Sequence, residues 1–113
     1  MNYEIEMMKY ANQLKIISKN KEVGIEHKKN IEGIFMGTKV NLNSDGFRNN
    51  NDLKINSKKI LMLGDSMTFG WGASKPFPNI LDKKISNYEV INAGIGNTNT
   101  IMQVENFFNN HKS

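Results

Sequence analysis

The sequence contains no cysteine, and this absence removes several classes of site at once. Disulfides, thiolate catalysis and zinc or iron–sulfur centres held by cysteine are excluded. The sequence does not indicate a redox compartment, because a chain without cysteine is compatible with an oxidising or a reducing environment. No apolar run approaches the ~18 residues of a membrane span. Residues 1–6 carry acids where a signal peptide would carry lysines, so the chain as written is expected in the cytoplasm.

Concentrated positive charge is also lacking, although the chain is basic. Its 15 lysines and arginines exceed its 11 acids, which gives a net charge of +4. No run of five like charges occurs, and no aromatic side chains alternate with the lysines. The lysines therefore predict a solvated surface, and we expect no nucleic-acid partner.

Recognisable cofactor and metal motifs are missing as well. No P-loop is present, and neither histidine lies in a cluster with metal-ligand spacing. Gly94 and Gly96 resemble part of a dinucleotide-binding loop, but the third glycine is replaced by Asn99. We therefore expect neither a cofactor nor a metal.

The chain has 113 residues, which is enough for one small domain. Its two parts differ in character. Residues 1–58 form a mainly polar leader. Hydrophobic spacing and turn residues predict its elements. These are a helix over 4–18, a loop over 20–30, a strand over 34–42, a turn at 43–46 and a polar connector over 49–59.

Residues 59–113 alternate strand and helix. The predicted elements are a strand over 59–63, a loop at 70–73, a helix over 79–86, a strand over 88–91 and a helix over 98–109. This order is typical of the start of a doubly wound α/β sheet. Ligands of such sheets bind beyond the carboxyl ends of the strands. The glycine-rich loops after Leu63 and Ile91 fall at that edge.

Ser66 is the most informative residue of the chain. The apolar run Ile60–Leu63 ends in the turn Gly64-Asp65-Ser66, so a buried strand delivers a serine to the rim of a sheet. Nucleophilic serines are commonly presented in this way. Asp65 is expected to hydrogen-bond the turn rather than to act as an acid or base, because adjacent side chains point in different directions. Thr68 and Trp71 are expected to pack the following loop.

Three segments resemble motifs of the SGNH (GDSL-type) hydrolases. Gly64–Ser66 with 68–72 resembles the first motif, and 90–100 resembles the second. Residues 36–40 and 43–48 resemble an "NSxGFR" leader that precedes the first motif in one bacterial branch. The resemblance implies the start of a three-layer α/β/α, flavodoxin-like fold. In it, 59–113 would be an incomplete N-terminal part of the hydrolase domain, and 1–58 a helix and strand extension.

The resemblance also implies a chemistry. Ser66 would be the nucleophile, and its backbone N–H would donate to the oxyanion. A second N–H would come from Gly96 or Asn97, between which the sequence does not decide, whereas Gly94 is expected to be a packing glycine. The substrate would be an acyl ester of a small molecule or a carbohydrate, including O-acetyl groups.

Two later motifs of the family, Gly-x-Asn-Asp and Asp-x-x-His, are absent. His27 and His111 do not match the family's base histidine, and both are expected at the surface. A serine hydroxyl needs a base to become nucleophilic at neutral pH. We therefore expect a fragment of a serine ester hydrolase, either cut from a longer chain or completed by a separately encoded C-terminal half that supplies the base.

Two alternatives remain open from the sequence: a catalytically inactive remnant, and a non-enzymatic α/β binding domain. The family resemblance also leaves a cell-envelope location open for the parent protein. The chain alone is expected to be marginally stable, because a parallel strand without its neighbours exposes an apolar edge.

Overall fold

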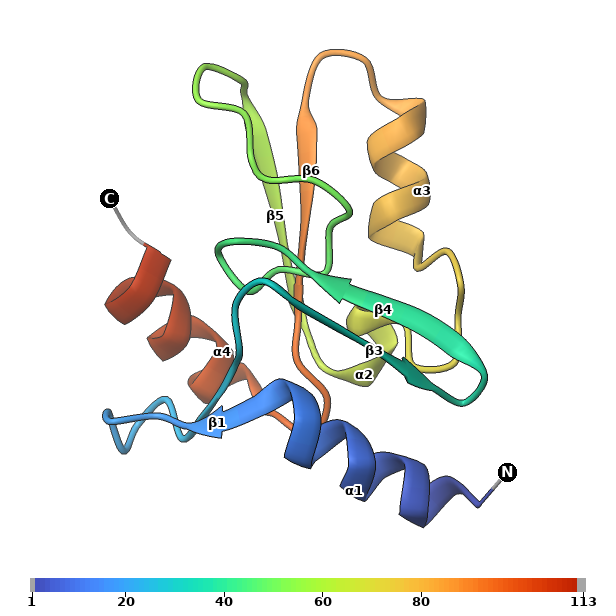
Figure 1. The fold of residues 1–113 in the computed structure, drawn as a ribbon. Coiled ribbons are helices and arrows are strands. Elements are labelled where there is room, and N and C mark those ends of the chain that lie inside the picture. Colours follow the sequence, from blue (N-terminus) through green and yellow to red (C-terminus); the bar gives the residue numbers. More distant parts are fainter. Residues whose placement is uncertain (1, 112–113) are drawn as a thin grey trace.

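The computed structural model describes residues 2–111, and these form a mixed α/β fold (Figure 1). The strands make three separate two-stranded sheets, paired β1–β2, β3–β4 and β5–β6. In order along the chain, the elements are α1 (Tyr3–Leu14), β1 (Lys15–Ile17), β2 (Ile25–His27), β3 (Ile31–Phe35), β4 (Thr38–Leu42), β5 (Lys59–Gly64), α2 (Ser66–Phe69), α3 (Phe77–Lys84), β6 (Glu89–Gly94), α4 (Thr100–Asn106) and a short π-helix (Phe107–His111).

The first helix, α1, is shorter than the sequence predicts. It begins at Asn2, whose side chain accepts a hydrogen bond from the N–H of Ile5, and it ends at Leu14. The next three residues form β1 instead of a last helical turn, since they pair antiparallel with β2. The predicted loop over 20–30 is therefore also wrong, because it contains β2.

A hairpin replaces the single strand predicted over 34–42. Strands β3 and β4 pair antiparallel from Ile31 opposite Leu42 to Phe35 opposite Thr38. The two residues between them, Met36 and Gly37, have φ values of 49° and 73°. Two consecutive positive φ angles are the signature of the tight turn that matches strand twist. Methionine is unusual there, which is why the sequence gives no turn signal.

The second part of the chain forms a parallel β–α–β unit, as predicted. Strands β5 and β6 run parallel, in register from Lys59 opposite Glu89 to Gly64 opposite Gly94. Helices α2 and α3 lie between them in the chain. The predicted strands over 59–63 and 88–91 are confirmed, and the helix predicted over 79–86 begins two residues earlier. The helix predicted over 98–109 is divided into α4 and the π-helix.

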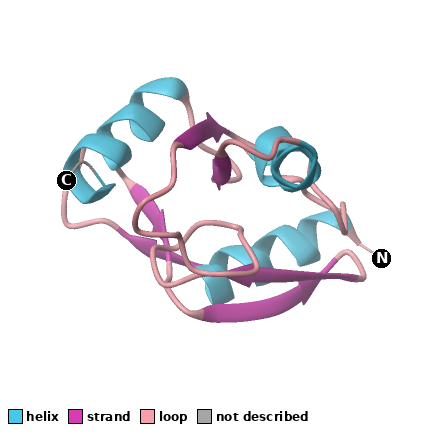
Figure 2. Ribbon diagram, turned by 90° about the horizontal axis from the view of Figure 1, so that it is seen from above, coloured by secondary structure: helices cyan, strands magenta, loops and turns pink. Residues whose placement is uncertain are grey.

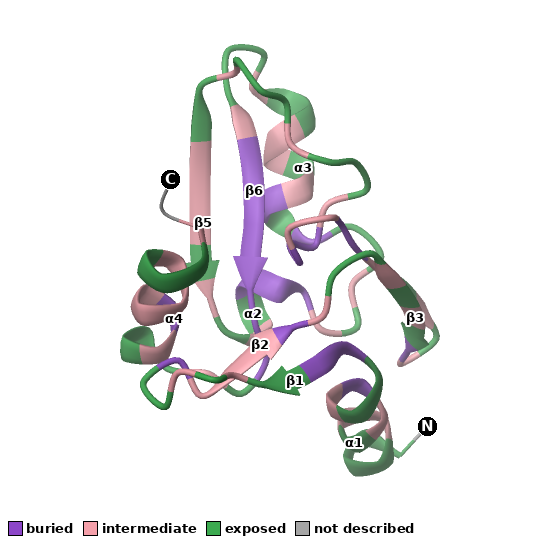
Figure 3. Cartoon of the chain, turned by 60° about the vertical axis from the view of Figure 1, so that its left-hand side comes forward, coloured by how far each residue is buried: buried purple, intermediate pink, exposed green. Residues whose placement is uncertain are grey.

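Leader and β–α–β unit share one hydrophobic core. Its largest cluster joins five leader side chains to one from α2, with Trp71 packed against them. The buried members are Tyr10, Leu14, Phe35, Val40, Leu42 and Phe69. In Figure 3, buried positions run along β6 and into α1, β2 and α2. Residues 1–58 are thus an integral part of the packed fold.

The outer edge of β6 is closed without a neighbouring strand. The side-chain amide of Asn49 donates to the carbonyl of Val90 (3.0 Å) and accepts from the N–H of Asn92 (3.0 Å), as a strand backbone would. The N–H of Arg48 donates to the Asn92 carbonyl, and Asp82 accepts from the Val90 N–H. By contrast, no strand of residues 2–111 pairs with the outer edge of β5.

No helix in the described part of the chain is long and apolar enough to cross a membrane. Figure 2 shows the arrangement of the helices and the small sheets from above. The fold is therefore α/β in character, as expected.

Candidate functional site

Ser66 stands at the carboxyl end of β5, where the sequence places it. Gly64 ends the strand, Asp65 caps α2, and Ser66 is the first helical residue. The Asp65 carboxylate accepts a hydrogen bond from the N–H of Met67 (3.0 Å), so it holds the turn as expected. The Ser66 side chain is half-buried and makes no hydrogen bond to any of residues 2–111. Its hydroxyl is free to meet a ligand.

Two glycines allow the turn to lie close to its surroundings. A Cβ on Gly64 would collide with the side chain of Thr68, which packs over the strand end. A Cβ on Gly94, at the end of β6, would collide with the backbone of Phe69 in α2. Gly94 is therefore a packing glycine, as the sequence indicates. Together they let α2 pack against both strand ends.

The loop after β6 lies beside the serine turn. The N–H of Ile95 donates to the carbonyl of Gly64 (3.0 Å), which continues the ladder past the strand ends. Gly96 follows and is buried, whereas Asn97 is exposed with φ of 61°. Asparagine is one of the few residues that adopt this left-handed conformation readily. The two loops predicted to share a sheet edge therefore meet there.

Leader residues bind both backbone polar groups of Gly96. Its N–H donates to the Tyr10 hydroxyl (3.0 Å), and its carbonyl accepts from the Lys15 ammonium (2.5 Å). The Gly96 N–H is therefore occupied. The next N–H, that of Asn97, has no hydrogen-bond acceptor within residues 2–111. Because a trans peptide directs its N–H and C=O in opposite directions, Lys15 also fixes the direction of the Asn97 N–H.

Tyr10, Lys15 and His27 form a buried polar cluster that the sequence did not reveal. The Tyr10 hydroxyl lies 2.6 Å from the His27 Nε2, and the Lys15 ammonium lies over the Tyr10 ring at 4.7 Å. The Tyr10 hydroxyl therefore joins the Gly96 N–H to the His27 ring, and the direction of the Tyr10–His27 hydrogen bond is set by the tautomer of the imidazole. Burial, and then the charge of Lys15, lower the pKa of His27 to about 3. Burial also raises the pKa of Tyr10 and lowers that of Lys15.

Arg48, which belongs to the leader motif, binds the C-terminal end of α2. Arg48 is 4% exposed, and its guanidinium donates to the carbonyls of Phe69 (2.8 Å), Gly70 (2.7 Å) and Ala73 (2.8 Å). The same group lies 5.1 Å from the centre of the Phe69 ring. Burial lowers its pKa to about 10, so the group stays charged at neutral pH. Arg48 thereby fixes the loop that follows Ser66.

Trp71 packs the loop, as expected, rather than facing solvent. Its ring contacts those of Tyr3, Tyr10 and Phe35, at centroid distances of 6.2, 5.4 and 6.3 Å. Its indole nitrogen is buried and donates to no group in the described chain. Thr68 is buried too.

Neither histidine is placed to serve as the base of Ser66. The expected surface position of His27 is wrong, since the residue is 7% exposed and its ring is hydrogen-bonded to Tyr10. His111 stacks on Phe47 at 4.5 Å, and burial lowers its pKa. Neither makes a hydrogen bond to Ser66. No group of three or more histidine or acidic side chains among residues 2–111 could hold a metal ion.

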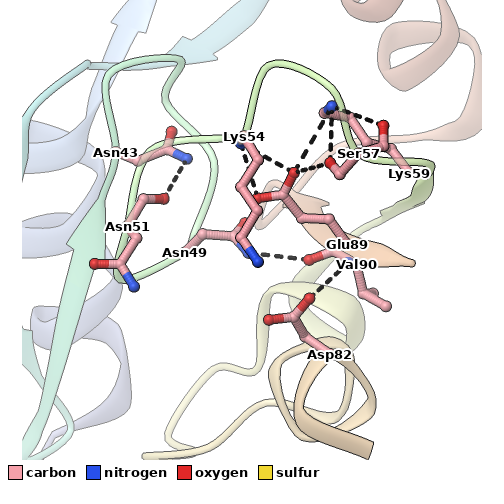
Figure 4. A network of polar contacts seen from close by, with 9 residues as sticks. All are labelled: Asn43, Asn49, Asn51, Lys54, Ser57, Lys59, Asp82, Glu89 and Val90. Carbon is pink, nitrogen blue, oxygen red and sulfur yellow. Dashed lines mark hydrogen bonds and ion pairs between the residues drawn. The ribbon is translucent and has the colours of Figure 1, made fainter. Parts of the chain in front are cut away.

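The opposite ends of β5 and β6 carry a second polar region, shown in Figure 4. The Glu89 carboxylate accepts from the N–H of Lys54 (3.1 Å) and the hydroxyl of Ser57 (2.8 Å), and it pairs with Lys59 (3.8 Å). An open hollow of about 830 Å³ lies beside this network. The hydrogen bonds of this network join the polar connector to β6. The network therefore has a structural role.

A scan against protein-family models and a search of curated proteins each found no match.

Proposed function

We propose that this chain carries the nucleophile half of an SGNH-type serine ester hydrolase. The observation that carries the proposal is the side-by-side placement of the Ser66 turn and the Gly96–Asn97 loop at one end of a parallel sheet. The free Ser66 hydroxyl belongs to the first of these two segments, and the free backbone N–H of Asn97 belongs to the second. Those are two of the three elements that acyl transfer needs. The flavodoxin-like three-layer fold belongs to the same proposal.

In this reaction the Ser66 oxygen attacks the carbonyl carbon of an acyl ester, and the carbonyl oxygen becomes an oxyanion. The N–H groups of Ser66 and Asn97 donate to it. Asn97 is preferred over Gly96, because the Gly96 N–H is bound to Tyr10. The Lys15 ammonium on the Gly96 carbonyl polarises the peptide that contains the Asn97 N–H. An oxyanion donor held in place before reaction contributes about 10²–10³ in kcat.

The third element, a general base, comes from outside this chain in the proposal. His27 is neutral, buried and bonded to Tyr10, and His111 is stacked on Phe47. The unpaired edge of β5 is where further polypeptide of the same domain would join the sheet. Esters of small acyl groups, including O-acetyl carbohydrates, are the proposed substrates.

Covalent labelling with a fluorophosphonate tests the nucleophile without requiring turnover. Imidazole added at millimolar concentration would supply the missing base. We expect one adduct by mass spectrometry, located at Ser66, which depends on imidazole and is absent from Ser66→Ala. Ser74→Ala, at an exposed serine in the same region, should be labelled like the parent chain. Labelling that persists in Ser66→Ala, or that never occurs, would contradict the proposal.

The same adduct distinguishes Asn97 from Gly96. Its phosphoryl oxygen occupies the place of the oxyanion, so the backbone proton that donates to it moves downfield. We expect this shift in the ¹⁵N–¹H NMR spectrum at Asn97 and not at Gly96. The reverse result would assign Gly96 as the donor.

A second candidate, an inactive remnant or a non-enzymatic α/β binding domain, is favoured by one observation: no base lies beside Ser66 in the described chain. It predicts no labelling of Ser66 at any imidazole concentration.

A further inference from the structure

A small pocket away from the serine is lined by four basic side chains and by no acid. It is lined by residues of β4, of the segment that follows β4, and of α3 with the loop before it, and its volume is about 170 Å³. Figure 1 shows how these elements are arranged. Lys39, Arg48, Lys75 and Lys83 contribute the positive charge. The whole chain has 15 basic and 11 acidic residues, so such a one-sided lining is unusual for this protein.

The burial of Arg48 distinguishes this pocket from an ordinary surface of solvated lysines. Arg48 is 4% exposed, and its guanidinium donates hydrogen bonds only to backbone carbonyls. Carbonyl dipoles satisfy its N–H groups but leave a full positive charge without a counter-ion. A buried charge without an opposite charge is costly, and an anion nearby reduces that cost.

The three lysines add to this uncompensated charge. Lys39 pairs with Glu32 at 3.3 Å, although both side chains are largely exposed. Lys75 and Lys83 have no acidic partner within residues 2–111. Exposed pairs contribute little in water, so Glu32 does not neutralise the pocket. Like charges gathered without an acid repel one another, and an anion among them reverses the sign of that interaction.

The pocket also offers neutral donors. The side chains of Asn50 and Ser74 line it and make no hydrogen bond with any described residue. Its volume is smaller than the ~300–1,000 Å³ of pockets that enclose drug-sized ligands. It suits one compact anionic group.

We propose that this pocket binds a compact oxyanion, represented by phosphate, either free or as a substituent of a larger molecule. The site is independent of Ser66 and of the esterase proposal. Lys75 and Lys83 supply the charge that can move towards the anion, and buried Arg48 supplies a fixed charge behind it.

Titration of ¹⁵N-labelled protein with inorganic phosphate, at ionic strength kept constant with sodium chloride, tests the site. We expect saturable shifts of the amides of Asn50, Lys75 and Lys83. The double variant Lys75→Gln/Lys83→Gln should weaken phosphate binding about tenfold, since it removes two charges within contact distance. Arg48 is left intact because it also supports the fold.

The matched control is Lys19→Gln/Lys21→Gln, which changes the net charge equally at exposed positions of the leader. It should bind phosphate like the parent, and so should Ser66→Ala. Shifts that rise linearly without saturation, or an equal loss in the control, would overturn the proposal. Glycerol 3-phosphate identifies the source: affinity equal to that of phosphate shows that a substituent is accepted, and binding of free phosphate alone assigns the ion itself.

Discussion

The two outer edges of the β5–β6 sheet differ in whether their outward-facing backbone groups are hydrogen-bonded. Along β6, side chains and one backbone N–H satisfy the groups that a neighbouring strand would bind. Along β5, no strand of residues 2–111 is present, and Leu63 is 37% exposed. Natural sheets protect edges because an unpaired edge is a template for association. The difference shows that the leader completes one side of the sheet and leaves the other available.

The largest expected effect comes from removing the residue that holds the leader against α2. Arg48→Met leaves the carbonyls of Phe69, Gly70 and Ala73 without donors in a buried place. We expect a loss of ~3–5 kcal/mol in the free energy of unfolding, measured by urea denaturation. Arg48→Lys should recover only part, because an ammonium lacks the planar fork of donors. A loss below ~1 kcal/mol in Arg48→Met would contradict this role of the guanidinium.

Acid should weaken the packing of the leader, because it protonates His27. Its pKa is about 3 in the folded chain and 6.5 when unfolded, so the unfolded state binds the proton first as pH falls. Stability is therefore complete above pH 6.5 and is lost below it, by ~3 kcal/mol at pH 4.

The variant His27→Gln should remove this pH dependence, whereas His111→Gln should keep most of it. Thermal unfolding between pH 4 and 7 measures both. An unchanged pH profile in His27→Gln would show that other groups cause the acid sensitivity.

A smaller effect is expected from opening the closed edge directly. Asn49→Ala removes a donor to Val90 and an acceptor for Asn92, both of which are fully buried. We expect a loss of ~2 kcal/mol, together with faster hydrogen exchange of the Asn92 amide.

Asn51→Ala is the matched control, since its side chain is exposed and makes no hydrogen bond to residues 2–111. Asn49→Asp keeps the acceptor and should fall between the two. Equal stability of Asn49→Ala and Asn51→Ala would show that the edge is not closed by this amide.

The smallest effect on stability is expected at the open edge. Leu63→Lys places a charge beside the unpaired groups of β5 and should change the free energy of unfolding by less than ~1 kcal/mol. Association at high concentration, measured by light scattering, should decrease. Ile55→Lys, at a position that is 93% exposed in the connector, should leave association as it is in the parent. A similar decrease in both variants would point to general charge repulsion instead.

The sequence predicts the β–α–β unit well because its signals are local. The apolar run before Ser66 and the glycine-rich ends of both strands follow from hydrophobic patterning and turn chemistry. The same patterns locate Ser66, Gly94 and the loop after β6. They fail for β1 and β2, because strands of three residues are too short to show a hydrophobic period.

The contacts that orient the site could not be read from the sequence either. Tyr10 and Lys15 lie in what reads as an ordinary amphipathic helix, yet both contact Gly96. Arg48 carried the one available signal, as the last residue of the leader motif. The many asparagines, which composition alone leaves unexplained, include Asn49, whose side-chain amide replaces strand pairing along β6.

The hydrogen bond between Gly96 and Tyr10 also has a kinetic consequence, because it joins residues 86 positions apart. Closing a flexible loop of that length costs ~4 kcal/mol in chain entropy. Contacts this distant form late, after local turns and helices. We therefore expect the serine turn, whose hydrogen bonds are local, to form first, and the loop beside it to acquire its final shape only when the N-terminal helix packs against it. In that order of folding, the first residues of the chain are the last to complete its site.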